Sequence, residues 1–211
     1  MTEAICSALI LNSDEFAVIA GMRNDNHFIG YQLPKESQEI QERYKGLNSL
    51  IRRKILIRCK DEYYINDAYR NLIQAVVNMK MCFVISNNIG IIYCSETLCL
   101  VRTIEAVSPM YSLMTVTPDS FVQLLLDEGL IPDKDEYDFM MKSVEPLTQQ
   151  GFQNDDENLI IKISKYSSKR YVEIRRIGLC MMIITMNAQE AAFERYTVAG
   201  FKRILEYLLK G

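Results

Sequence analysis

The chain has 211 residues, of which 49% are hydrophobic and 24% charged, and its formal net charge is −3. This composition is typical of a globular protein and excludes wholesale disorder, and the negative charge disfavours a protein that coats a polyanion. The longest apolar run, at 177–186, is about half the length of a membrane-spanning helix, and the N-terminus lacks a signal-peptide pattern. We therefore expect a cytoplasmic protein with no membrane segment, built as one large domain or two fused halves.

Four elements are predicted in the first 80 residues. The Asn12-Ser13 pair can cap a helix that has two acidic residues in its first turn and ends near Gly21. A longer helix is expected from Lys35 to about Ile57, because apolar residues recur on one helical face. Lys60-Asp61 separates two short β-like runs and predicts a hairpin, after which a helix should extend from 66 to 79.

The middle of the chain changes to β-like runs that predict an antiparallel meander, at 81–85, 90–94, 99–104 and 112–116. Thr117 as a cap and Pro118 at the first helical position then predict a helix that runs to Gly129. The acidic start at Asp133 predicts a further helix to about Gln150.

The last 55 residues are predicted to contain three strands followed by helical structure. The strands are expected at 159–164, 170–176 and 179–185. Residues 188–210 are predicted to be helical with a break at Gly200. The final helix would place its apolar residues on one face, namely Phe201, Ile204, Leu205 and Leu208.

Together these elements predict an α+β fold in which antiparallel sheets are flanked by helices. A capped helix, a longer helical region and several strands follow one another twice, and Leu33-Pro34 before one long helix matches Ile131-Pro132 before the other. Either an internal duplication or the shared chemistry of helix caps would produce this match. In the first case, 1–111 and 112–211 would be pseudo-symmetric α+β halves of one integrated domain.

Residues that usually carry catalysis are few. His27 is the only histidine, and its polar surroundings predict a solvated loop. No glycine-rich phosphate motif is present. The cysteines lack Cys-x-x-Cys spacing and are expected to be free thiols in the core: Cys6, Cys59, Cys82, Cys94, Cys99 and Cys180. We therefore predict a protein that is not an enzyme, with no catalytic, cofactor-binding or metal-binding residues.

Two further groups of residues have a structural and a functional interpretation. The acidic cluster of Asp133, Asp135, Glu136 and Asp138 can start a helix or bind a hard cation, and the missing calcium-loop glycine favours the helix start. The 11 methionines, including Met140-Met141 and Met181-Met182, can fill a core or form an adaptable partner surface, and we expect them mainly in the core.

The N-terminal elements also have the order of a winged helix: helix 14–21, helix 35–54 and the hairpin around Lys60-Asp61. The second helix would carry three cations for phosphate binding, Arg52, Arg53 and Lys54. Glu36, Glu39 and Glu42 share that helix and would repel phosphate, so DNA binding is the weaker interpretation.

The layout of the chain resembles the EspG-type proteins of type VII (ESX) secretion systems and their Gram-positive relatives. The resemblance is carried by the helix start at Leu11–Phe16, by Tyr31-Gln32-Leu33-Pro34 before a helix with Glu42-Arg43, by the turn into a hairpin at Leu50–Ile57, and by the strand meander. It implies a cytosolic, non-enzymatic α+β fold with pseudo-twofold halves that binds helical secretion substrates and keeps them soluble.

The leading hypothesis is therefore a type VII secretion-associated chaperone or adaptor that holds an amphipathic helical partner on a sheet face or edge and adjoining helices. The alternative is a winged-helix transcription regulator that uses Arg52, Arg53 and Lys54. A third hypothesis is an enzyme that works through carboxylates such as Asp133 or Glu136, because carboxylate pairs leave little sequence signature.

Overall fold

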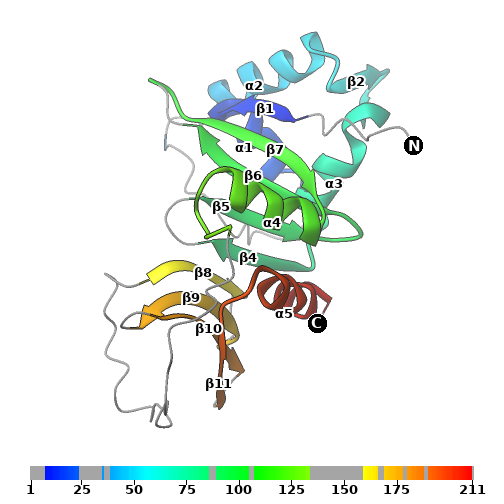
Figure 1. Ribbon diagram of the computed structural model, residues 1–211. Helices are drawn as coiled ribbons and strands as arrows, with labels where there is room; N and C mark the ends of the chain where they lie inside the picture. The colour runs from blue at the N-terminus through cyan, green and yellow to red at the C-terminus, as the bar shows by residue number, and fades with distance from the viewer. Residues whose placement is uncertain are drawn as a thin grey trace, which may run out of the picture. The chain divides into compact units, whose positions relative to one another are not determined.

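A computed structural model describes residues 8–23, 35, 39–85, 89–104, 107–133, 159–165, 169–177, 180–187 and 190–210. The chain divides into two compact units, an N-terminal unit to Thr117 and a C-terminal unit from Pro118 (Figure 1). The sequence placed this division between 111 and 112, which is inside the last strand of the N-terminal unit. The predicted α+β class, with antiparallel sheets and flanking helices, is confirmed.

The sheet of the N-terminal unit has the strand order β1-β7-β6-β5-β4, and every pair is antiparallel. Its strands are β1 (Leu9–Asn12), β4 (Met81–Ile85), β5 (Gly90–Cys94), β6 (Leu98–Ile104) and β7 (Met110–Val116). The predicted meander is therefore present as β4 to β7. Strand β1 was not foreseen, because its strand character depends on pairing with β7, where Leu9 lies opposite Leu113.

The helical elements of this unit are α1 (Ser13–Ala20), α2 (Ile40–Arg52), the 3-10 turn η2 (Asp67–Tyr69) and α3 (Arg70–Val77), and a small hairpin joins β2 (Leu56–Cys59) to β3 (Glu62–Ile65). The predicted cap of α1 is confirmed: the Glu15 backbone N–H donates to Asn12 Oδ1 at 2.9 Å, and the Asn12 N–H donates to Glu15 Oε2 at 3.0 Å. Helix α2 begins at Ile40, later than the predicted Lys35.

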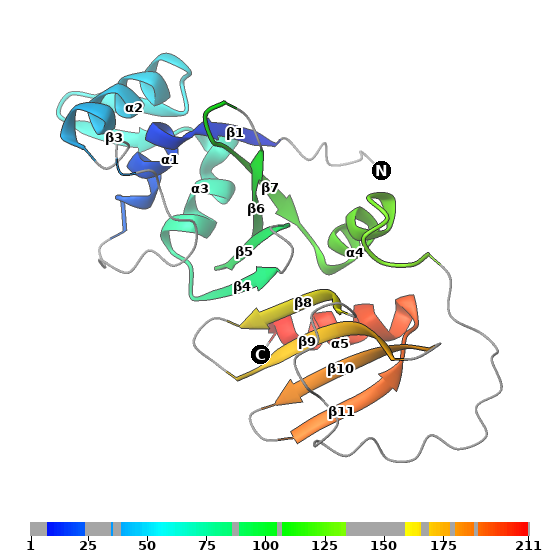
Figure 2. The same cartoon turned by 90° about the vertical axis from the view of Figure 1, so that its left-hand side faces the viewer.

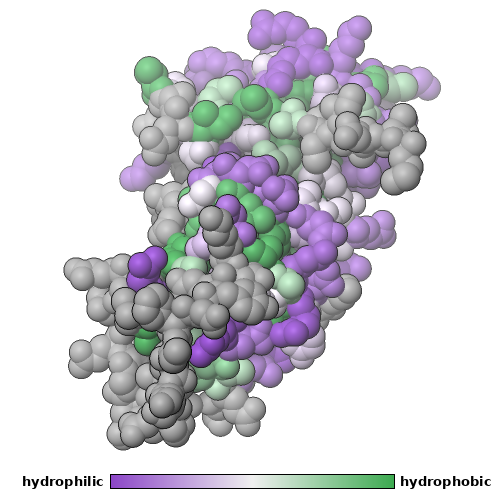
Figure 3. Space-filling model, viewed as in Figure 1, coloured by the Kyte–Doolittle hydropathy of each residue, from purple (hydrophilic) through white to green (hydrophobic). Residues whose placement is uncertain are grey.

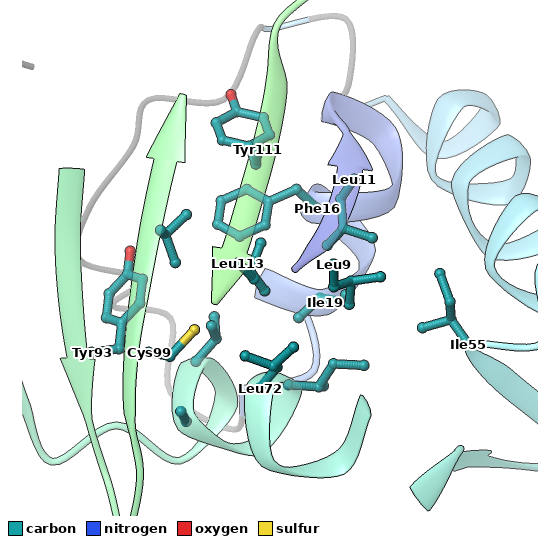
Figure 4. Packing of buried hydrophobic residues seen from close by; sticks show 14 of the residues in the cluster. Leu9, Leu11, Phe16, Ile19, Ile55, Leu72, Tyr93, Cys99, Tyr111 and Leu113 are labelled. Atoms are coloured by element: carbon teal, nitrogen blue, oxygen red, sulfur yellow. The ribbon is translucent and has the colours of Figure 1, made fainter. Parts of the chain in front are cut away.

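The core of the N-terminal unit lies between the sheet and helices α1 and α3 (Figures 2 and 4). Phe16 of α1 stacks on Tyr111 of β7, with 4.5 Å between the ring centroids. Leu72 from α3 and Leu113 from β7 are also buried, as Figure 4 shows. Because α1 is short, its stability depends on the packing of this apolar face more than on helix propensity.

The C-terminal unit has a four-stranded antiparallel sheet in the order β8-β9-β10-β11, with one helix before it and one after it in the chain. Its elements are α4 (Pro118–Asp127), β8 (Leu159–Lys165), β9 (Tyr171–Ile177), β10 (Cys180–Asn187), β11 (Glu190–Arg195) and α5 (Val198–Lys210). Val172 and Ile174 of β9 are buried, as are Phe201 and Leu205 of α5, and α5 contacts β9. The helix predicted at 133–150 lies outside the described residues except for Asp133.

The prediction of helical structure from 188 with a break at Gly200 was wrong. Residues 190–195 form strand β11, in which Phe193 lies opposite Ile184 of β10, because pairing to a free sheet edge outweighs the helix propensity of Glu, Ala and Arg. Helix α5 begins at Val198 and continues through Gly200. Its first turn is capped by Thr197, whose Oγ1 accepts the Gly200 N–H at 2.9 Å.

Candidate interaction surface

Helix α2 is held close to α1 by a glycine. A Cβ atom at Gly46 would lie 2.4 Å from the backbone oxygen of Asp14, a distance that side chains do not tolerate. The two backbones therefore approach each other more closely than any other residue at position 46 would allow. This approach fixes which side of α2 faces the core and which side faces outward.

The same contact is completed by a buried carboxylate. Glu15 is 1% exposed, and its carboxylate accepts hydrogen bonds from the Ser49 hydroxyl at 2.7 Å and from the Arg53 guanidinium at 2.6 Å. Arg53 also donates to the backbone oxygen of Ile10 at 2.7 Å. Glu15 thus caps α1 and anchors α2, and its charge is paired as a buried charge must be.

These contacts separate the three cations that the sequence grouped as a phosphate-binding set. All three side chains are exposed at the surface, but Arg53 pairs with the Glu15 carboxylate and serves the fold. Lys54 has a left-handed backbone with φ 58° just after the C-cap Arg53, and its carbonyl accepts a hydrogen bond from Asn66 Nδ2 at 2.8 Å. Arg52 and Lys54 therefore remain available on the surface, and Arg53 does not join them.

The apolar stripe of α2 extends beyond the core. Leu47 and Ile51, in the second half of the helix, pack against the buried cluster. Tyr44 and Ile40 lie on the same helical face, about one and two turns before Leu47, and they are 64% and 74% exposed. The first half of α2 thus presents apolar side chains that do not contribute to the core.

The β2–β3 hairpin has an inner and an outer face, which its register defines. Leu56 pairs with Ile65 on the inner face, where Leu56 is buried. Ile57 pairs with Tyr64 on the outer face, together with Cys59 and Glu62, and all four side chains are exposed. Glu62 accepts a hydrogen bond from the Tyr64 hydroxyl. The outer face therefore carries an apolar cross-strand pair that the fold leaves exposed.

We call residues 39–65 the α2–hairpin segment. Ten large hydrophobic side chains are exposed among the described residues, and five of them belong to this segment: Ile40, Tyr44, Ile57, Tyr63 and Tyr64. The segment has seven Lys or Arg against four Asp or Glu, which is a formal charge of +3 in a chain of net charge −3. Figure 3 shows hydrophobic surface at the position of the hairpin, beside hydrophilic surface. Exposed apolar and tyrosine side chains ringed by charge are typical of interaction sites.

The prediction of buried free thiols is confirmed for three cysteines and wrong for one. Cys82, Cys94 and Cys99 are buried and free, and burial raises the pKa of Cys82 and of Cys99 to about 12. Both thiols are therefore protonated at neutral pH and poor nucleophiles. Cys59 is exposed because it lies on the outer face of a hairpin without a third strand. Cys6 and the Cys180 side chain lie outside the described residues.

A second buried carboxylate lies in the sheet of the C-terminal unit. Glu173 accepts hydrogen bonds or ion pairs from Lys162 at 2.8 Å and from the buried Arg175 at 2.6 Å. The Lys162 ammonium also lies 4.1 Å from the centroid of the Tyr171 ring. Glu173 is therefore paired with two cations, as a buried charge requires.

Several predicted residues fall in parts of the chain that are not described. His27, Asp135, Glu136, Asp138 and Met140-Met141 lie outside the described residues, whereas Asp133 is exposed and Met181 is buried. Across the described ranges, no group of three or more His, Cys, Asp or Glu side chains is arranged to hold a metal ion. In the same ranges, every helix is too short or too polar to span a membrane.

The exposure of the α2–hairpin segment was missed at the level of sequence, because Ile57, Tyr63 and Tyr64 were interpreted only as strand residues. A signal was present in the sequence: successive strand residues point to opposite faces, so the apolar neighbours Leu56 and Ile57 cannot both face the core. Comparison with known proteins finds no family model that matches this chain and no curated protein similar to it.

Proposed function

We propose that this protein is a non-catalytic adaptor that acts in the cytoplasm and binds a helical partner protein through the α2–hairpin segment. The observation that carries this proposal is the outer hairpin face, where Ile57 and Tyr64 are 49% and 51% exposed although the rest of the unit has a closed core. The exposed half of this pair leaves apolar area in water, which is unfavourable unless a partner covers it. The resemblance to EspG-type proteins suggests a type VII secretion substrate as that partner.

The chemistry of the segment indicates what the partner presents. Ile57 and Tyr64 are directly opposite on neighbouring strands, so a partner helix can cover both with apolar residues at i and i+3 or i+4. Arg58 and Lys60 lie at the same hairpin and are exposed. A helix with an apolar stripe therefore complements this face in shape, and acidic flanks would complement Lys60 in the turn and the formal charge of +3 on the α2–hairpin segment.

Affinity capture from extract of the native cell, with the captured protein identified and then titrated directly, tests this function. The wild type should bind a small helical protein, and the double variant Ile57→Ser with Tyr64→Ser should bind at least tenfold more weakly, because interface tyrosines and their apolar neighbours dominate binding energy. Val107→Ser is the matched control, since Val107 is fully exposed and lies outside the segment. Equal affinity of the double variant and the wild type would exclude this surface.

A second candidate function is nucleic-acid binding, which the exposed cations of the same segment favour. Arg52, Lys54, Arg58 and Lys60 are exposed, and Tyr63 and Tyr64 lie among them, a combination that can bind phosphates and stack on bases. Fluorescence anisotropy with a labelled duplex and a labelled single strand tests it. Binding that weakens with salt and is lost in the variant Arg52→Ala with Arg58→Ala would support this function. Flat titrations at low salt would dismiss it.

A further inference from the structure

A pocket in the C-terminal unit lies where the last turns of α5 cross the ends of strands β8, β9 and β10. Figure 2 shows the carboxyl end of α5 near the point at which β8 ends and β9 begins. Val172 of β9 lies at the pocket, opposite Ile204 and Leu208 of α5. Val172 and Leu208 are buried, and Ile204 is half-buried, so these apolar side chains form a wall that a ligand can reach.

Two cations complete this pocket. Lys165 at the end of β8 and Arg170 just before β9 line it, and the Lys165 backbone N–H donates to the Arg170 carbonyl at 3.0 Å, which holds the two residues side by side. No acidic residue is found among the described residues that line the pocket. The lining therefore combines an apolar wall with a positive rim, and this complements a group that is apolar at one end and anionic at the other.

The size of the pocket limits what its apolar part can hold. Its volume is about 30 Å³, whereas one water molecule needs roughly 10–15 Å³ on the same measure. A small branched side chain fits such a space, but the acyl chain of a lipid needs several times more. Tyr207 lies at the rim and is 73% exposed, so its ring can cover a bound side chain.

We propose that this pocket binds the carboxyl-terminal residue of a partner polypeptide. A small aliphatic side chain, such as that of valine, packs against Val172, Ile204 and Leu208, and the terminal carboxylate pairs with Lys165 and Arg170. Arg has five donors and Lys three, so both cations can donate to the carboxylate alongside their interactions within the protein. The site lies in the C-terminal unit and does not depend on the function proposed for the α2–hairpin segment.

Methyl NMR of the full chain, labelled at Ile, Leu and Val, tests this site with a synthetic peptide. The probe is acetyl-Gly-Ser-Gly-Ser-Val with a free carboxylate, and its matched control is the same peptide as the carboxamide. Peptide addition should shift the methyl signals of Val172, Ile204 and Leu208. The carboxylate peptide should bind at least tenfold more tightly than the carboxamide, because a charge-assisted hydrogen bond is lost in the control.

Variants test whether Lys165 and Arg170 cause the difference in affinity between the carboxylate and the carboxamide peptide. Lys165→Met and Arg170→Met should each reduce the preference for the carboxylate to less than threefold, whereas Arg176→Met, an exposed cation of the same sheet, should retain it. Because the preference is a ratio of two affinities for one protein sample, a loss of stability in a variant does not mimic it. Ile204→Trp, which fills the pocket, should abolish binding of both peptides.

Three results would overturn the proposal. Equal affinities for the carboxylate and the carboxamide would show that the cations do not recognise a terminal carboxylate. Shifts confined to methyl groups outside the pocket would remove the site. Decanoate that binds tenfold more tightly than the peptide, at the same methyl groups, would identify a site for anionic lipid in place of a chain terminus.

Discussion

The α1–α2 contact and the outer face of the β2–β3 hairpin lie in the same compact unit, and adjoining stretches of chain build both. In the contact, the Glu15 carboxylate accepts hydrogen bonds from Asn12, Ser49 and Arg53, and Gly46 leaves no free space. On the outer face, Ile57 and Tyr64 are about half exposed. At the contact the buried charge is hydrogen-bonded and the backbones are closely packed, whereas the outer face leaves apolar area in water.

This difference separates residues that build the unit from residues that are free to bind. Polar groups at the contact are costly to disturb because a buried carboxylate without its donors incurs the full desolvation penalty. Side chains on the outer face can change without such a cost. Substitutions at the contact should therefore lower stability, and substitutions on the outer face should change binding alone.

The largest effect is expected at Gly46. Gly46→Ala places a Cβ atom against the Asp14 backbone, so α2 must move away from α1, and the free energy of unfolding should fall by about 3 kcal/mol. Urea denaturation measures this change, with Asn48→Ala on the exposed side of α2 as the control. A change below about 0.5 kcal/mol at Gly46 would mean that α2 does not pack on α1 in this way.

The next largest effect on stability is expected at Arg53, and its neighbour Arg52 is the control. Arg53→Ala should lower the free energy of unfolding by about 2 kcal/mol, less than for a fully buried pair because the Arg53 side chain is 39% exposed. Arg52→Ala should change it by less than about 0.5 kcal/mol. Thermal and urea unfolding of both variants decide this comparison. Equal losses would contradict the assignment of Arg53 to the fold and Arg52 to the surface.

The buried thiols predict a loss of stability at high pH. Burial raises the folded-state pKa of Cys82 and Cys99 to about 12, so both stay protonated on folding while the unfolded chain ionises from about 9. The contribution of the two neutral thiols to the free energy of unfolding is complete below pH 9 and is lost as the pH rises towards 12. Each thiol should lower the free energy of unfolding by roughly 1 kcal/mol at pH 10. The double variant Cys82→Ala with Cys99→Ala should show a flatter decline between pH 8 and pH 10, and an unchanged slope would contradict this.

The smallest effect on stability is expected on the outer face. The double variant Ile57→Ser with Tyr64→Ser removes side chains that are already half in water, so the free energy of unfolding should change by less than about 0.5 kcal/mol. Urea denaturation beside the Val107→Ser control measures it. A loss of 2 kcal/mol or more would show that the pair supports the fold and would weaken its assignment to a partner.

Local patterns predicted most elements of the fold. The Asn12 to Glu15 capping box, the Lys60-Asp61 turn and the Thr117-Pro118 helix start all act within a few residues, so the chain signals them directly. Segments 9–12 and 190–195 have weak or helical local preferences, and they become strands only because β7 and β10 offer edges. The candidate surface was not predicted, because the same residues form a strand whether their outer face is covered or open.

The sequence by itself determined the α+β class, the caps and turns, and the burial of the central thiols, because each depends on local propensity or on apolar runs. The tertiary structure decided that Arg53 pairs with Glu15 while Arg52 faces outward, and that Ile57 and Tyr64 remain exposed. These outcomes depend on which elements pack together across 34 to 38 residues of chain, as in the bonds from Ser49 and Arg53 to Glu15. Contacts at that separation leave no local pattern, since either neighbour of an Arg-Arg pair can face the core.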